Sequence, residues 1–278
     1  MTKSPLSLKR RLLRLSLWLA GIALALLTYG ELLGSQTDAY FMAHHTAHNA
    51  PEVNISPQSL TDNATSQAPG TTLSYYGITF EVPWTGISEQ KTARNVAALK
   101  SASGQALIIW APTGKEGMLY DIATDEKGMG GPTMNALLAQ DIKESPYAQE
   151  SALLTSSASQ VRFLDPPRVS WRRAFLLLFK AMAEDPELKS GIYAFQSSPV
   201  RGFQLGNPAY ASRIRLDFFD SAGNSLGEVV CFFGKDASAR GTQADLNRII
   251  QTFHPVANSA AAVPTTGPRL TSTKPPGK

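Results

Sequence analysis

The sequence predicts an α+β fold, in which helices cover a mainly antiparallel sheet in an α/β/α sandwich-like arrangement, preceded by one transmembrane helix. Three observations support this class. Strand-like alternation recurs between residues 78 and 234, and amphipathic helical spacing appears at 170–188 and 245–253. An apolar run near the start of the chain predicts the membrane helix.

The apolar run extends from Leu15 to Leu33 and contains 19 residues. At about 1.5 Å per residue it reaches roughly 28 Å, close to the thickness of a hydrocarbon core. Five cations precede or edge the run, and the first acid of the chain is Glu31. This asymmetry predicts a cytoplasmic head at 1–11, a signal anchor at 12–33 in the inner membrane, and a periplasmic or external remainder.

A cleaved signal peptide is the alternative interpretation of the same run, since its length suits either. No A-x-A-like triplet follows Leu27, so the uncleaved anchor is preferred. Lipid attachment is excluded, because Ser35 stands where the modified cysteine would have to be.

The basic character of the chain belongs to its two ends. Of 26 Lys and Arg residues, five precede residue 15 and three follow residue 255, whereas all 22 acids lie between. Residues 15–255 therefore carry a net charge of −4, and the electrostatic argument for a nucleic-acid partner fails. The single cysteine excludes an intramolecular disulfide.

Composition divides the remainder into three parts. Residues 34–72 are polar and lack periodic apolar pattern, which predicts a flexible linker. Residues 73–255 predict one extracytoplasmic α+β domain, and residues 256–278 predict a disordered tail rich in Ala, Pro and Thr.

Five stretches predict strands, at residues 78–82, 105–112, 191–206, 212–220 and 227–234. The stretches at 105–112 and 227–234 are apolar on both faces, so both are expected to be covered on two sides. The long stretch at 191–206 is expected to bend near Pro199 and Gly202.

Three helices are expected between and after these strands. Thr133 caps the first, which runs to about Lys143, and Ser170 caps the second, at 170–188. The apolar spacing of the second helix predicts that one side faces the core, while cations such as Lys180 extend their charged ends to solvent. A helix that lies on a membrane surface is the alternative interpretation. Thr242 or Asp245 caps the third.

No catalytic residue, metal site or cofactor is predicted. Cys231 lies among Val and Phe in a strand, and His254 is the single imidazole after residue 48. The stretch APTGKEG lacks the first glycine and the Ser/Thr of a phosphate loop. Asp121, Asp125 and Glu126 lack calcium-loop spacing, and the HHTAH stretch at 44–48 lacks a carboxylate partner.

One bent strand and its exit loop carry the side chains that predict binding. Protein interfaces and ligand clefts favour amphipathic aromatic residues beside an arginine. The candidate binding residues are Arg201, Phe203, Gln204, Asn207 and Tyr210. An ordinary sheet edge is the alternative interpretation.

The opening YYGITFEVPW and the ending GEVVCFFG followed by DLNRIIQTF resemble the PsbP/Mog1-type α/β/α sandwich. The resemblance covers residues 73–255 in outline, and the long insertion at 115–167 departs from it. Most proteins of that type are accessory or assembly factors, so the resemblance implies binding. The single-pass arrangement is also similar to VirB8-like subunits of envelope assemblies, although their domains end on strands.

Together these observations predict a membrane-anchored, extracytoplasmic and non-catalytic interaction or assembly module. Its expected partners are the lipid bilayer, through residues 12–33, and envelope proteins. The alternative is an exported hydrolase that uses acidic residues. A pocket that collects two or more acids would favour the hydrolase.

Overall fold

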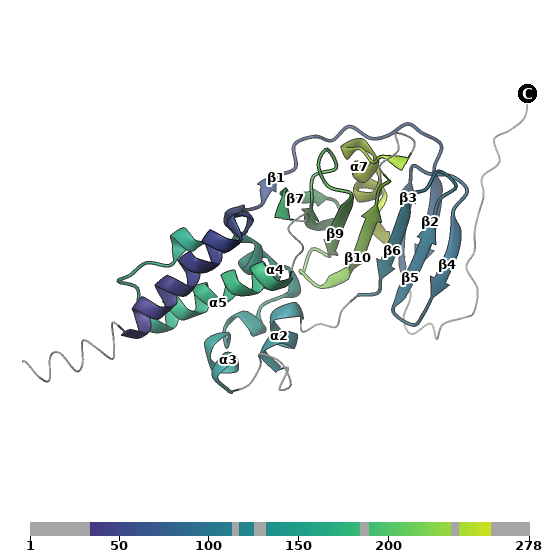
Figure 1. Ribbon diagram of the computed structural model, residues 1–278. Coiled ribbons are helices and arrows are strands. Elements are labelled where there is room, and N and C mark those ends of the chain that lie inside the picture. The colour runs from purple at the N-terminus through teal and green to yellow at the C-terminus, as the bar shows by residue number, and fades with distance from the viewer. Residues whose placement is uncertain (1–33, 113–116, 125–131, 184–188, 235–238, 257–278) are drawn as a thin grey trace, which may run out of the picture.

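The computed structural model describes residues 34–112, 117–124, 132–183, 189–234 and 239–256. These residues form an eight-stranded sheet, a three-stranded sheet and a group of helices packed beside the large sheet (Figure 1). The helices lie at the end of the molecule where the described chain begins.

The large sheet has the strand order β1-β7-β8-β9-β10-β6-β5-β4. Its strands are β1 (Gln58–Ser59), β4 (Ser88–Thr92), β5 (Val96–Lys100), β6 (Ala106–Trp110), β7 (Ile192–Ser197), β8 (Val200–Leu205), β9 (Arg213–Phe219) and β10 (Ser225–Phe232). Strand β1 pairs parallel with β7, whereas the other pairs are antiparallel, so the sheet is mixed. Residues 191–206 form the hairpin β7–β8 instead of one bent strand.

A second layer covers one face of the large sheet. It consists of β2 (Thr71–Tyr75), β3 (Ile78–Val82), β11 (His254–Pro255) and helix α7 (Gln243–Thr252). Thr242 caps α7 in a reciprocal capping box with Asp245. Buried side chains of this layer and of strands β5 to β10 form the main hydrophobic core.

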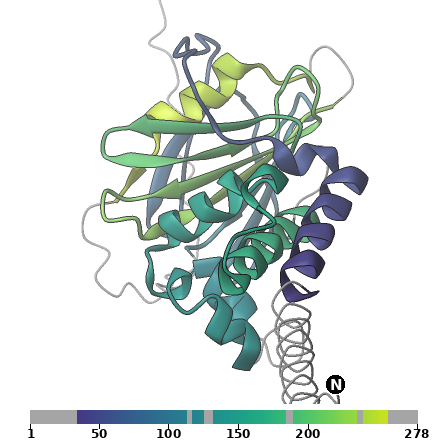
Figure 2. The ribbon, with the colours of Figure 1, turned by 90° about the vertical axis from the view of Figure 1, so that its left-hand side faces the viewer.

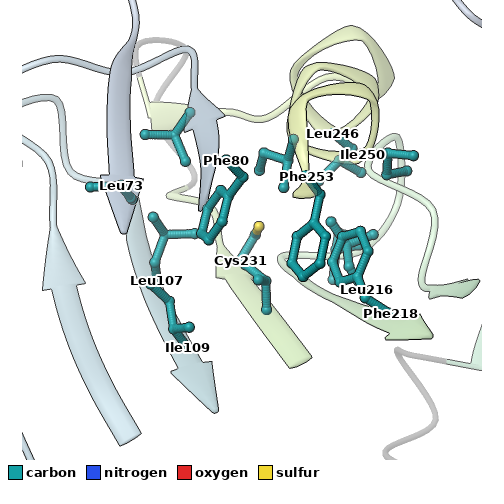
Figure 3. Packing of buried hydrophobic residues seen from close by; sticks show 14 of the residues in the cluster. Leu73, Phe80, Leu107, Ile109, Leu216, Phe218, Cys231, Leu246, Ile250 and Phe253 are labelled. Atoms are coloured by element: carbon teal, nitrogen blue, oxygen red, sulfur yellow. The ribbon is translucent and has the colours of Figure 1, made fainter. Parts of the chain in front are cut away.

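Aromatic rings occupy the centre of this core (Figure 3). The rings of Phe218 and Phe253 stack with centroids 3.7 Å apart, and Phe80 stacks on the other side of Phe253 at 5.9 Å. Cys231 lies in the same core and is fully buried. Three phenylalanines from β9, β3 and the end of α7 thus join the two layers.

The opposite face of the large sheet is covered over β7, β8 and β9 by helix α4 (Pro146–Thr155). Leu154 packs there against Phe203, Leu205 and Phe219, and Tyr147 stacks on Phe203 with ring centroids 5.1 Å apart. Ser145 caps this helix and Pro146 starts it, a common N-terminal pattern.

The remaining helices pack on one another beside α4 (Figure 2). They are α2 (Gly117–Thr124), α3 (Pro132–Leu137), α5 (Pro167–Ala183), the short 3₁₀ helices η1 (Pro51–Asn54), η2 (Asp141–Lys143) and η3 (Ala158–Gln160), and a helix over residues 34–49. Helix α5 begins at Pro167, not at Ser170, because proline suits the first helical position.

Residues 34–49, expected to be part of a flexible linker, are helical and packed against α5. Ala39 and Ala43 are fully buried there beside Ala174 and Leu177, because small side chains let two helices approach closely. The later part of the expected linker is also attached, since Asn247 donates hydrogen bonds to the carbonyls of residues 62 and 64.

Lys180 of α5, expected to snorkel, is instead fully buried. Its ammonium donates to the carbonyl oxygens of Ile55, Leu154 and Ser156, at 2.7, 2.6 and 3.2 Å. Burial, with the nearby charge of Lys189, lowers the pKa of Lys180 to about 8. This side chain fastens the segment after helix 34–49 to the C-terminal end of α4.

The predicted fold class is therefore corrected in two respects. The sheet is mixed because residues 58–59 join it parallel to β7. Moreover, no helix among the described residues is long and apolar enough to cross a membrane. The predicted head (1–11), anchor (12–33) and most of the predicted tail (257–278) lie outside the described residues.

Candidate functional site

A cavity of about 210 Å³ lies where α2 and α4 meet the large sheet. Among its lining residues are Trp110, Asp121, Glu150, Arg215, Asp217 and Glu228. A pocket that collects two or more acids is the feature expected of the hydrolase, and this cavity does collect several acids.

Arg215 joins two of these acids. Its guanidinium contacts a carboxylate oxygen of Glu150 at 3.2 Å and one of Asp217 at 2.8 Å, and all three side chains are mostly buried. Arg215 and Asp217 are two residues apart on β9, so strand alternation places both on the same face. A guanidinium that binds both carboxylates holds them as ion-pair partners, and this favours a structural role over acid–base chemistry.

The cavity is small, and among the described residues its acids form no metal-ligand cluster. Ligand sites in proteins occupy about 300–1,000 Å³, which is more than this cavity offers. No group of three or more His, Cys, Asp or Glu side chains in the described part of the chain could hold a metal ion. The HHTAH stretch lies on helix 34–49, where His44 contacts the ring of Tyr40 and His45 bonds to Asn49.

The cavity borders a part of the large sheet that we call the open face. The register brings together Ala98, Ile108 and Val230 in one row and Val96 with Trp110 in the next. These side chains and Phe232 belong to none of the hydrophobic clusters formed by the described residues. They point away from the main core, because strand neighbours alternate between the two faces.

Exposure varies across the open face. Trp110 is 43% exposed and Val230 is 8% exposed, whereas Val96, Ala98, Ile108 and Phe232 are half-buried. Both β6 and β10 were expected to be covered on two sides. Among the described residues, α4 packs over the neighbouring strands β7 to β9, and α2 reaches β6 and β10 only at the cavity, beside Trp110 and Glu228. The prediction of two-sided cover therefore holds at Val230 of β10, which is buried, but not at Ile108 of β6, which is half-buried.

Polar groups border the open face on the β9 side. Arg215 lies across from Val230 and Asp217 across from Glu228, so the charged row of β9 continues the apolar rows of β10 and β6. Protein interfaces commonly combine a central Trp and other apolar groups with a charged rim that includes Arg. The open face and its cavity therefore have the composition of a contact surface.

The structure separates the five candidate binding residues. Arg201 and Phe203 lie on the α4 side of β8, where Arg201 covers the ring of Tyr147 at 3.9 Å and Phe203 is 1% exposed. Gln204 is fully buried and hydrogen-bonds to Gln243 of α7, on the opposite face of the strand.

The other two candidates lie in the loop after β8. Asn207 donates to the hydroxyl of Tyr193, and Tyr210 is 83% exposed. Phe203 and Gln204 thus support packing between layers, and a folded partner cannot reach them. The buried Nε of Arg201 has no hydrogen-bond partner among the described residues, and the face of the Tyr147 ring interacts with the guanidinium charge.

Cys231 and His254 do not form a nucleophilic pair. Burial raises the pKa of the Cys231 thiol, which disfavours the thiolate. His254 is exposed on β11 and its Nδ1 lies 2.8 Å from the carbonyl oxygen of Thr252.

Comparisons of the chain with protein-family models, with curated proteins and with solved structures found no match. The resemblance to the PsbP/Mog1-type sandwich therefore stays a prediction.

Proposed function

We propose that this protein is a non-catalytic interaction module that contacts a protein partner through the open face. The observation that carries the proposal is the half-covered apolar surface of β5, β6 and β10, with the partly exposed Trp110 at its border. Trp is among the residue types that most often supply a large share of the binding free energy at protein interfaces.

The proposed location is outside the cytoplasm, at a bilayer that residues 12–33 contact. Its support is the cation asymmetry at the start of the sequence. A reporter that is active only in the cytoplasm, fused after Lys278, should stay inactive in a bacterial host. Activity of that reporter would contradict the proposed location without affecting the contact proposal.

A photo-crosslinking amino acid at Trp110 tests the contact proposal. In cells that produce the full chain, this probe should yield a discrete crosslinked product. The same probe at Gln90, which is exposed on edge strand β4 of the same sheet, serves as the control. Ala98→Arg places a charge in the middle of the open face and should abolish the product, whereas Gln90→Arg should not.

Two results would contradict the contact proposal. The first is equal crosslinking from Trp110 and Gln90, and the second is a product that Ala98→Arg leaves unchanged. Circular dichroism of the purified variants confirms that each retains its fold.

The hydrolase is the second candidate, because the cavity does hold acids near Arg215. If it were correct, the purified chain would turn over a substrate, and Glu150→Gln would abolish turnover while retaining the fold. We expect no turnover, since Arg215 engages both Glu150 and Asp217.

A further inference from the structure

A second apolar surface lies at the other end of the molecule, where helix 34–49 and α5 both begin. The loop between η3 and α5 exposes Leu164 by 86% and Phe163 by 42%. The exposure of two adjacent large apolar side chains to water is unfavourable, and another surface that covers them removes this cost.

This loop is held firmly beside the start of helix 34–49. Gln36 donates to the carbonyl oxygen of Asp165 at 2.8 Å, and Arg173 forms an ion pair with the Asp165 carboxylate at 2.5 Å. The ring of Phe163 contacts that of Tyr40 edge to face, with centroids 6.1 Å apart. The apolar tip is therefore presented in a defined orientation relative to residue 34.

Cations flank the apolar tip. Arg162 precedes it and Arg168 follows it, and both are exposed. Arg172 and Arg173, by contrast, form ion pairs with Asp141 and Asp165. The exposed pair gives the tip the mixture of apolar and basic groups that binds anionic lipid surfaces.

An open groove of about 740 Å³ lies at the same end. Its lining includes Leu137, Arg168, Trp171 and Phe175, and the indole of Trp171 donates to the hydroxyl of Ser35 at 2.8 Å. Trp beside Arg is characteristic of side chains at the boundary between lipid and water.

The short distance in sequence between this surface and the apolar run favours a lipid bilayer as its binding partner. The apolar run of the sequence ends at Leu33, and Gln36, which holds the loop, follows three residues later. Three helical residues rise about 4.5 Å, whereas the headgroup layer on each side of a bilayer is about 5–8 Å thick. A bilayer in contact with residues 15–33 would meet the loop at headgroup depth.

We propose that the end of the molecule formed by residues 162–168 rests on an anionic lipid surface, with Phe163 and Leu164 in the interface. The cations Arg162 and Arg168 then face the phosphates of the lipid headgroups. This surface is separate from the open face, so the molecule has one side for lipid and another for a protein partner. Arg172 and Arg173 of α5 are instead paired with Asp141 of η2 and with Asp165 of the loop.

A site-specific fluorescent probe tests the proposal in the full chain reconstituted into vesicles. Leu164→Cys is labelled with a fluorophore whose emission shifts to the blue in apolar surroundings. Gln90→Cys on β4, at the opposite edge of the sheet, is the matched control. Because Cys231 is buried, we expect no labelling of it in the folded protein, and the unsubstituted chain checks this.

In vesicles that contain an anionic lipid, the Leu164 probe should shift to the blue and be quenched by brominated acyl chains. The Gln90 probe should show neither effect. Arg162→Ser with Arg168→Ser should remove the dependence of the Leu164 signal on anionic lipid.

Three results would overturn the proposal. Equal behaviour of the two probes would show that the loop does not meet the lipid. A blue shift without lipid that rises with protein concentration would assign the surface to a second copy of the chain. A shielded Leu164 probe at all concentrations, insensitive to brominated lipid, would show that another part of the same chain covers it. None of these results would affect crosslinking at Trp110.

Discussion

The buried ammonium of Lys180 makes the stability of this fold depend on pH in a predictable direction. The native pKa is about 8, and the pKa of an unfolded lysine is 10.5. Between these two values the unfolded state binds the proton and the native state does not. The free energy of unfolding should therefore rise with pH across this window. Below pH 8 the native state keeps the ammonium buried, and the full cost of burying this charge lowers the free energy of unfolding.

The size of the effect follows from the pKa shift. Each unit of difference in pKa corresponds to about 1.4 kcal/mol, so the window between 10.5 and about 8 contributes at most about 3.5 kcal/mol. The three carbonyl acceptors favour the ammonium and reduce this value. Among the described residues, Lys180 is the donor observed for the carbonyls of Ile55 and Ser156. Lys180→Met at pH 7 removes this donor, and we expect the free energy of unfolding to fall by about 2–4 kcal/mol.

Urea unfolding of the full chain in a non-ionic detergent, followed by tryptophan fluorescence, measures both quantities. The difference between wild type and Lys180→Met should widen from pH 8 to pH 10, because other titrating groups contribute equally to both proteins. Lys91→Met on exposed strand β4 is the control and should change stability by less than about 0.5 kcal/mol. A difference that does not vary with pH would refute the assignment of the buried proton to Lys180.

Three further predictions concern packing and capping. Cys231→Ser should lower the free energy of unfolding by about 1–3 kcal/mol, because a hydroxyl replaces a thiol in an apolar core; rapid reaction of the native thiol with a bulky maleimide would contradict its burial. Gly202→Ala should cost about 3 kcal/mol or more in denaturant unfolding, since the new Cβ would lie 1.9 Å from the backbone oxygen of Asp217 in the adjacent strand. Thr242→Ala should cost about 0.5–2 kcal/mol through loss of the α7 cap, and an unchanged melting temperature would show that the capping box with Asp245 is not needed.

The local pattern of side chains was sufficient to locate several elements. Period-two alternation predicted β3 and β9, which the structure confirms at Ile78–Val82 and Arg213–Phe219. Thr242 was one of two caps predicted for α7, and it is the one observed. These predictions succeeded because capping and strand alternation depend on neighbours in the chain.

The places of the candidate binding residues in the fold could not be assigned from the local sequence. Phe203 and Gln204 looked suited to an interface, but α4 covers one and α7 contacts the other. The open face beside Trp110 was missed for the converse reason. Its strands look fully buried, because the sequence of β6 does not show how far a helix extends over the sheet.

By itself, the sequence determined the α+β class and the inward-facing apolar positions of strands such as β3 and β9. Only the tertiary structure decided that residues 34–49 pack on α5, that Lys180 is buried, and that Ile108 of β6 is half-buried among the described residues. Each of these three outcomes depends on contacts between segments far apart in the chain. Ala39 and Lys180 carry no local pattern that reveals such contacts, since their burial depends on which surfaces come to lie opposite them.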